Sequence, residues 1–68
     1  MPSTMQRVAV NLKRIRTARG LSQQALAAKV RTTRVYVAMI EGAIRAPSLD
    51  MLDRLARALK VTVGELVE

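Results

Sequence analysis

The sequence predicts an all-helical protein in which five helices form one compact domain over residues 1–68. Its 68 residues include only three glycines, two prolines and one aromatic residue, a composition that favours helices over a sheet. Apolar residues recur three and four positions apart, as on the buried face of a helix. Each of these runs begins close to a serine or threonine, the residues that cap helix N-termini. So short a chain buries a thin core, and self-association would add stability.

The first predicted helix begins at Ser3 or Thr4 and stops before Gly20, a residue common at helix C-termini. Its buried face holds Val8, Leu12 and Ile15. Ser22 caps a second helix from Gln23 to about Lys29, whose inward residues are Leu26, Ala27 and Val30. Residues 30–33 are predicted to form a turn. A third helix follows from Arg34 to about Glu41 and ends at Gly42.

Pro47 interrupts the chain again because it disfavours helix at the preceding residue. Ser48 caps a fourth helix with one apolar stripe, formed by Leu49, Leu52, Leu55, Ala56 and Leu59. Thr62 and Glu65 have the spacing of a capping box at the start of a fifth helix, and Val61 is placed to pack on Leu66 as a hydrophobic staple. The sequence shows no strand, repeat or linker.

The net charge of +7 is unevenly distributed. Residues 1–48 hold nine lysines and arginines against one acid, whereas residues 49–68 hold three against four. This asymmetry predicts one electropositive face and one face free for other contacts. Charge alone leaves nucleic acid, an anionic membrane and an unpartnered basic surface all open. The basic residues are spread over several helices, which disfavours membrane binding.

The chain has no cysteine and no histidine, which removes disulfides, thiol nucleophiles and the usual neutral-pH acid–base residue. There is no Gly-rich phosphate loop, and Asp50 and Asp53 are explained by the dipole at the start of the fourth helix. We therefore expect no enzyme, no cofactor and no metal site. The sequence has no apolar run long enough for a membrane span and no signal peptide, and we expect a cytoplasmic location.

Residues 23–42 have the pattern of a helix-turn-helix unit, two short helices joined by a turn of three to four residues. Ala27 supplies the small residue needed where the helices touch, while Val37 and Ile40 anchor the second helix. At about 100° per residue, this anchoring turns one face of the second helix outward. That face holds Arg34, Val35, Ala38 and Met39, with Tyr36 on one flank. Its short side chains and single guanidinium suit the major groove of DNA, although isolated exposed apolar residues are also common.

Most of the chain, from Leu12 to Leu66, resembles the lambdoid phage repressor and Cro family, also called the XRE family. The resemblance rests on the stretches RIRTARGLSQQALAAKV, TTRVYVAMIEG, APSLDMLDRLARAL and VTVGELV. It implies a five-helix lambda-repressor-like domain whose third helix reads double-stranded DNA and whose second helix crosses the DNA backbone.

The resemblance assigns Thr33, Arg34, Val35, Ala38 and Met39 to base contacts. It assigns backbone contacts to the start of the second helix, at Ser22 and Gln23, and to Arg45 in the loop after the third helix. We expect Arg31 to meet a phosphate, and the Tyr36 ring either to reach a phosphate or to pack on the helix surface. Arg16 and Glu41 match a buried salt bridge of the family, which makes Glu41 structural.

Two positions depart from the family pattern. Arg31 stands where relatives have glycine, so a left-handed backbone there would carry strain of roughly 1 kcal/mol or more. The glycine expected after the third helix is displaced by one, giving Gly42-Ala43. This displacement leaves the path of the loop at 43–46, and the position of Arg45, open.

The leading functional hypothesis is a repressor that binds a palindromic operator as a homodimer. No ligand-sensing domain is visible, which suits Cro-like repressors, controller proteins of restriction–modification systems, and antitoxins. Dimerisation is expected through the last two helices, with Met51, Val63 and Val67 exposed on the monomer. The alternative is a protein-interaction module, such as an antitoxin that binds a toxin, which would tolerate loss of Arg34.

Overall fold

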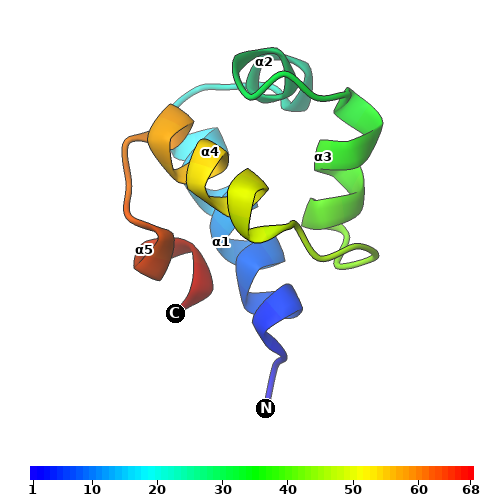
Figure 1. The fold of residues 1–68 in the computed structure, drawn as a ribbon, viewed down its shortest axis with the longest axis vertical. Helices are drawn as coiled ribbons and strands as arrows, with labels where there is room; N and C mark the ends of the chain where they lie inside the picture. Colours follow the sequence, from blue (N-terminus) through cyan, green and yellow to red (C-terminus); the bar gives the residue numbers. More distant parts are fainter.

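The structure, a computed structural model, describes all 68 residues and consists of five α-helices without a strand. The helices are α1 (Thr4–Ala18), α2 (Gln23–Lys29), α3 (Arg34–Glu41), α4 (Leu49–Leu59) and α5 (Val63–Val67). The predicted all-helical architecture is confirmed. In Figure 1, α2 is seen end-on at the top, α1 runs behind α4, and α3 and α5 lie on opposite sides. None of the five helices has the length and apolar character that crossing a membrane requires.

Serine or threonine caps every helix, as the sequence predicts. Of the two candidates at the first helix, Ser3 is the cap, and with Gln6 it forms a capping box that sequence reasoning missed. The predicted capping box of Thr62 and Glu65 is present, with a distance of 2.7 Å from the Thr62 amide to a Glu65 carboxylate oxygen. The remaining caps are Ser22, Thr33 and Ser48. Local side-chain chemistry therefore sets all five starting points.

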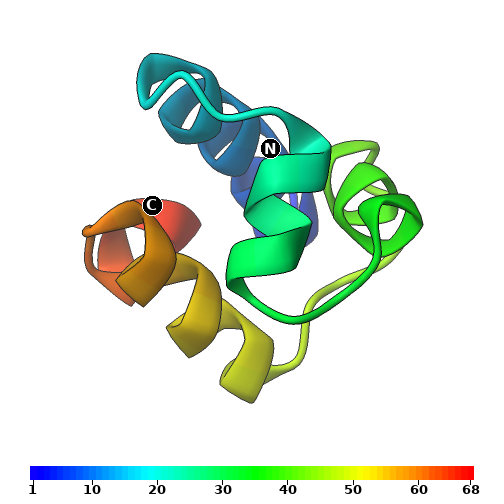
Figure 2. The ribbon, with the colours of Figure 1, turned by 90° about the horizontal axis from the view of Figure 1, so that it is seen from above.

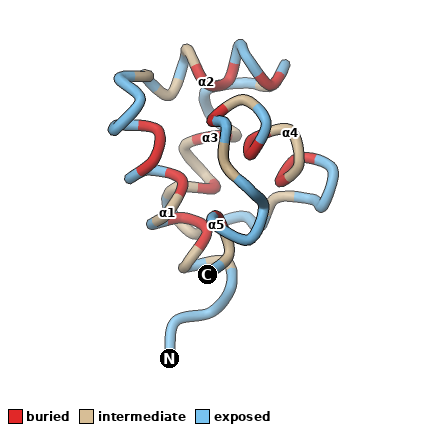
Figure 3. Tube along the Cα trace, turned by 90° about the vertical axis from the view of Figure 1, so that its left-hand side faces the viewer, coloured by how far each residue is buried: buried red, intermediate tan, exposed pale blue.

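The apolar core collects residues from all five helices and is one connected cluster. Figure 3 shows the buried segments on the inward sides of the helices, while the N-terminal segment is exposed. The largest side chains that are fully shielded from solvent are Val8, Leu12, Leu26, Val37, Ile40, Leu55, Leu59 and Leu66. Burial of a side chain of this size contributes about 1.5–3 kcal/mol. Val61 packs against this cluster, which contains Leu66, in agreement with the predicted staple.

Two residues of α4 exchange their expected environments. Leu49, assigned to the apolar stripe, is 85% exposed, whereas Met51, expected to be exposed, is only 7% exposed and belongs to the core. At 100° per residue, Leu49 lies about 70° and Met51 about 90° from the centre of the stripe formed by the other four residues, so both lie at its edges and helical phase separates them little. Leu49 is the first residue of α4 and lies next to the loop, while the flexible Met51 side chain fills the core one half-turn later.

Four residues have a left-handed backbone, and each ends a helix or follows its last turn. Gly20 after α1 has φ +70°, whereas the other three are Arg31, Ala43 and Lys60 with φ of 56–58°. Left-handed backbone is costly for residues with a Cβ. The strain predicted at Arg31 is therefore present, and Gly42 has a φ of −86° while its neighbour Ala43 takes the left-handed conformation.

Side chains of α1 hold the end of α5 by hydrogen bonds to its terminal carbonyls. Asn11 donates to the carbonyl oxygens of Leu66 and Glu68 at 3.0 and 2.9 Å, and Arg7 Nε donates to that of Val67 at 3.1 Å. These bonds satisfy carbonyl groups that have no partner within a helix end. As a result α5 is fixed to α1 although 44 residues separate the two helices in the sequence.

Candidate nucleic-acid interface

The recognition helix expected from the sequence is α3, and its two faces differ sharply. Val37 and Ile40 are 0% and 1% exposed and anchor the inner face in the core. On the outer face, Arg34 and Val35 are exposed, and Ala38 and Met39 are half-buried. Thr33 is exposed at the N-terminus of α3, where its hydroxyl oxygen accepts a hydrogen bond from the Tyr36 amide at 3.1 Å. The structure thus brings all five residues expected to contact bases onto one surface.

Tyr36 and Arg45, both expected to contact the DNA backbone, contact each other. The Arg45 guanidinium carbon lies 5.6 Å from the centre of the Tyr36 ring, and the half-buried ring also packs against the core. The loop after α3 folds back on the helix, because the Ile44 and Arg45 amides both donate to the carbonyl of Met39. The loop path left open by the displaced glycine therefore brings Arg45 to the side of α3.

The predicted pair Arg16 and Glu41 forms a buried salt bridge between α1 and the last residue of α3. Arg16 Nε and Nη2 donate to the two Glu41 carboxylate oxygens at 2.6 and 2.9 Å, and Nη1 donates to the Leu21 carbonyl at 2.7 Å. The side chains are only 9% and 4% exposed. The pKa of Arg16 is raised chiefly by hydrogen bonding to Glu41 and further by its charge, although burial acts in the opposite direction.

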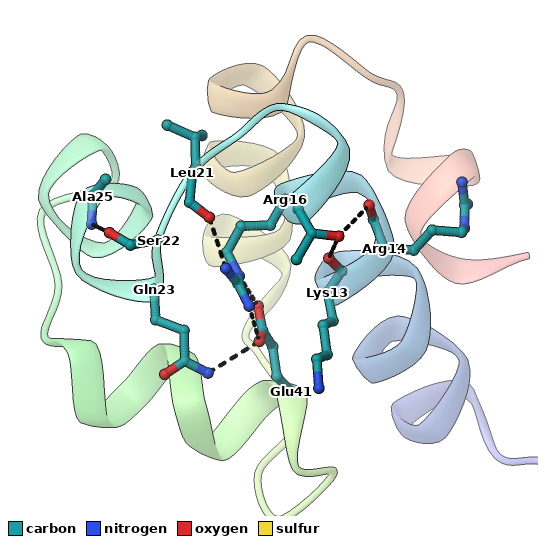
Figure 4. A network of polar contacts seen from close by, with 9 residues as sticks. Lys13, Arg14, Arg16, Leu21, Ser22, Gln23, Ala25 and Glu41 are labelled. Carbon is teal, nitrogen blue, oxygen red and sulfur yellow. Dashed lines mark hydrogen bonds and ion pairs between the residues drawn. The ribbon is translucent and has the colours of Figure 1, made fainter.

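Gln23, expected to contact a phosphate, is part of the same network. Its amide nitrogen donates to Glu41 Oε1 at 3.0 Å, as Figure 4 shows at the start of α2. The sequence gives no sign of this contact, because the two residues lie 18 positions apart. One N–H of the Gln23 amide is thereby occupied and the other is left for an outside acceptor. Ser22 is exposed beside it, and its hydroxyl oxygen caps α2 by accepting from the Ala25 amide.

The candidate DNA-backbone groups lie at the start, in the turn and towards the end of the helix-turn-helix unit. Ser22 and Gln23 lie at the start of α2, Arg31 is exposed in the turn before α3, and Tyr36 and Arg45 lie at the side of α3 and in its following loop. In the view from above, α2 and α3 are joined by this turn, and α5 lies on the other side of the molecule (Figure 2). This places the expected DNA surface and the expected dimer surface apart.

The residues expected at a dimer interface are less exposed than the sequence suggested. Met51 is buried, so its expected exposure is wrong. Val63 is 37% exposed, and Val67 is half-buried against the core. Exposed apolar side chains that the sequence analysis did not expect at the surface include Val10 on α1, Ile44 in the loop after α3, and Leu49 on α4, which was assigned to the buried stripe. No group of three or more acidic residues is placed to hold a metal ion.

A short turn between two helices, and a second helix anchored in the core with its opposite face outward, define a helix-turn-helix protein, the class of DNA-binding transcription regulators. Residues 12–66 match the model of the helix-turn-helix family HTH_3, and the chain belongs to this family. None of the curated proteins matches the sequence.

Three solved structures show the same fold. The hypothetical transcription factor NHTF from Neisseria matches 100% of this chain and 82% of its own, with 27% identity and a TM-score of 0.91. The restriction-modification controller protein C.AhdI from Aeromonas hydrophila matches 91% of this chain and 94% of its own, with 37% identity and a TM-score of 0.87. The controller protein C.Esp1396I matches 98% of this chain and 90% of its own, with 26% identity and a TM-score of 0.85. C.Esp1396I has also been solved as a tetramer in complex with its natural 35-base-pair operator.

Proposed function

We propose that this DNA-binding regulator represses transcription by binding a palindromic operator as a homodimer, with α3 in the major groove of each half-site. The observation that carries the proposal is the outer face of α3, which presents Arg34 and Val35 while buried residues anchor the opposite face. An arginine can donate two hydrogen bonds to O6 and N7 of guanine, and short apolar side chains contact thymine methyl groups. Arg34 would therefore specify a guanine, and Val35 and Met39 would favour thymine.

Backbone contacts would position α3 on both of its flanks without reading sequence. Ser22 and the free N–H of Gln23 would meet one phosphate at the start of α2. Arg31, Tyr36 and Arg45 supply a cation, a hydroxyl group and a second cation around α3. The cation–π contact of Arg45 with Tyr36 restricts the loop and lowers the entropic cost of ordering Arg45 on DNA.

The dimer would form through α5, where Val63 is exposed and the surrounding charge is close to neutral. The helices that read two half-sites must lie about one DNA turn, ~34 Å, apart. The molecule measures 31 × 22 × 22 Å along its principal axes, so two copies in contact have the size needed for this separation. A chain that sediments as a monomer at micromolar concentration would contradict the dimer.

A restriction–modification controller is the subtype that the 37% identity to C.AhdI supports best. Neighbouring genes for a restriction endonuclease and a methyltransferase are expected, whereas a toxin gene beside this one would favour an antitoxin. The function itself is tested by incubating the purified protein with random duplex DNA at near-physiological salt and sequencing the retained fraction. Enrichment of a palindrome is expected. Retention without an enriched sequence, lost steeply as salt rises, would leave only backbone binding and overturn the proposal.

A further inference from the structure

A second basic surface lies in a groove between the end of α2, the turn that follows it and the second half of α4. The groove has a volume of about 480 Å³ and is lined by Lys29, Val30, Arg31, Arg54, Arg57 and Ala58. Four of these six residues are cationic. Three of those four, on α2 and α4, take no part in the DNA surface described above, whereas Arg31 belongs to both surfaces.

The groove is held in shape by Arg54. Its Nη2 atom donates to the Val30 carbonyl at 2.6 Å, which fixes α4 against the end of α2. Arg54 also lies 3.6 Å from Asp50, and Arg57 lies 3.1 Å from Asp53, each one helical turn earlier on α4. The two aspartate side chains are 81% and 50% exposed, so solvent weakens both pairs.

The charges in the groove are not balanced within the protein. Lys29 and Arg31 form no ion pair, and the two aspartates offset only the cations of α4. Like charges gathered in a concave surface raise the local potential and attract anions. The structure therefore favours a negatively charged partner at this site.

We propose that the groove seats phosphate groups of the DNA backbone just outside the half-site read by α3. This inference rests on the proposed function and extends its contact surface. Arg31 joins the two surfaces, since it lines the groove and lies two residues before Thr33, the cap of α3. Continuity with the N-terminus of α3 favours a DNA strand over an acidic protein as the occupant. Lys29 and Arg57 would supply the additional phosphate contacts, while Arg54 holds the groove open.

The test uses the full chain and two duplexes that contain the selected operator. The short duplex ends at the outer edges of the half-sites, and the long one extends by one further helical turn on each side. The variants are Lys29→Gln and Arg57→Gln, which remove a charge without touching the Arg54 hydrogen bond. The matched control is Lys60→Gln, because Lys60 is an exposed cation that ends the same helix but does not line the groove. Thermal melting checks that all variants are folded.

On the long duplex, each groove variant should reduce the slope of log affinity against log salt by about 1.8, because the substitution removes one phosphate contact from each chain of the dimer and each contact contributes about 0.9. On the short duplex, the groove variants and the Lys60→Gln control should have the slope of the unsubstituted protein. Equal slopes for all proteins on the long duplex would overturn the inference, as would an equal loss on both duplexes. Failure of the unsubstituted chain to select any operator would instead contradict the proposed function, so the two failures are distinguishable.

Discussion

The half of the molecule that faces DNA in our proposal and the half that faces the partner chain are stabilised by different means. The segment containing α1, α2 and α3 carries nearly all of the excess positive charge, and a buried salt bridge joins α1 to α3 within it. The segment containing α4 and α5 is close to neutral and is held mainly by an apolar stripe. A buried ion pair fixes geometry more than it adds stability. The difference indicates that α3 is held by the packing of Val37 and Ile40 together with a polar pair at its end, whereas α4 is held mainly by packing.

Glu41→Ala should have the largest effect on stability, because it removes one partner of the buried salt bridge. The substitution leaves the buried Arg16 guanidinium with only the Leu21 carbonyl, at a cost of about 3–5 kcal/mol. That loss is comparable with the whole stability of so small a domain, ~0.05–0.15 kcal/mol per residue. Urea denaturation followed by circular dichroism measures it. The double variant Arg16→Met with Glu41→Leu removes both charges and should remain folded with stability close to the parent. Equal melting temperatures for Glu41→Ala and the parent would show that the pair has no structural role.

Arg34→Ala should separate DNA reading from stability. Arg34 is exposed and has no ion pair in the protein, so its substitution should change the free energy of unfolding by less than about 0.5 kcal/mol. Operator affinity should fall by about 1–3 kcal/mol for each half-site, and the preference for guanine at one position of each half-site should disappear. Fluorescence anisotropy with the operator and with single-base variants measures both effects. Unchanged affinity would favour an interaction module that does not read bases.

Arg31→Gly should stabilise the fold and weaken DNA binding. Glycine removes the strain of a left-handed residue, here at φ 58°, which is worth about 1 kcal/mol. The loss of one guanidinium from each chain of the dimer should weaken binding to all sequences alike and reduce the salt slope by about 1.8, which is about 0.9 for each half-site. Thermal melting and titrations at several salt concentrations test the two parts. Greater stability together with unchanged DNA affinity would remove Arg31 from the interface.

Lys60→Gly is the corresponding change in the other half of the molecule, since Lys60 has the same φ of 58°. It should stabilise the fold by about 0.5–1 kcal/mol and leave operator affinity and its salt dependence unchanged. The two glycine variants are compared in the same melting and binding measurements. Both should be more stable than the parent, but only Arg31→Gly should bind DNA more weakly. A loss of DNA affinity in Lys60→Gly would show that the charge of the α4 and α5 half also contributes.

The sequence predicts the helices well because their boundaries depend on local chemistry. Ser22, Thr33 and Ser48 each cap a helix through their own side chain, and the apolar spacing of α3 identifies its buried face correctly. The outward position of Arg34 follows from that spacing. The spacing of α4 misassigns Leu49 and Met51 because both residues lie at the edges of the apolar stripe, where helical phase does not decide burial.

Contacts between distant segments are the part that sequence reasoning does not reach. The bond from Gln23 to Glu41 and the bond from Arg54 to the Val30 carbonyl join residues 18 and 24 positions apart. No periodicity encodes such pairs, and only the resemblance to a known family suggested that Arg16 meets Glu41. The groove between α2 and α4 is invisible in the sequence for the same reason.

The attachment of α5 to α1 by Asn11 and Arg7 has a consequence for which operators the protein can tolerate. The same helix, α1, also carries Arg16, which binds Glu41 at the end of α3. The expected dimer helix α5 is therefore connected to α3 through α1. The distance and angle between the two recognition helices of a dimer would then be fixed by a rigid body and not by a flexible linker. One additional base pair at the centre of the operator turns the half-sites by ~34° and separates them by ~3.4 Å. A dimer of this construction would have to bend or untwist the DNA to follow, so its operator spacing should be as strictly selected as its bases.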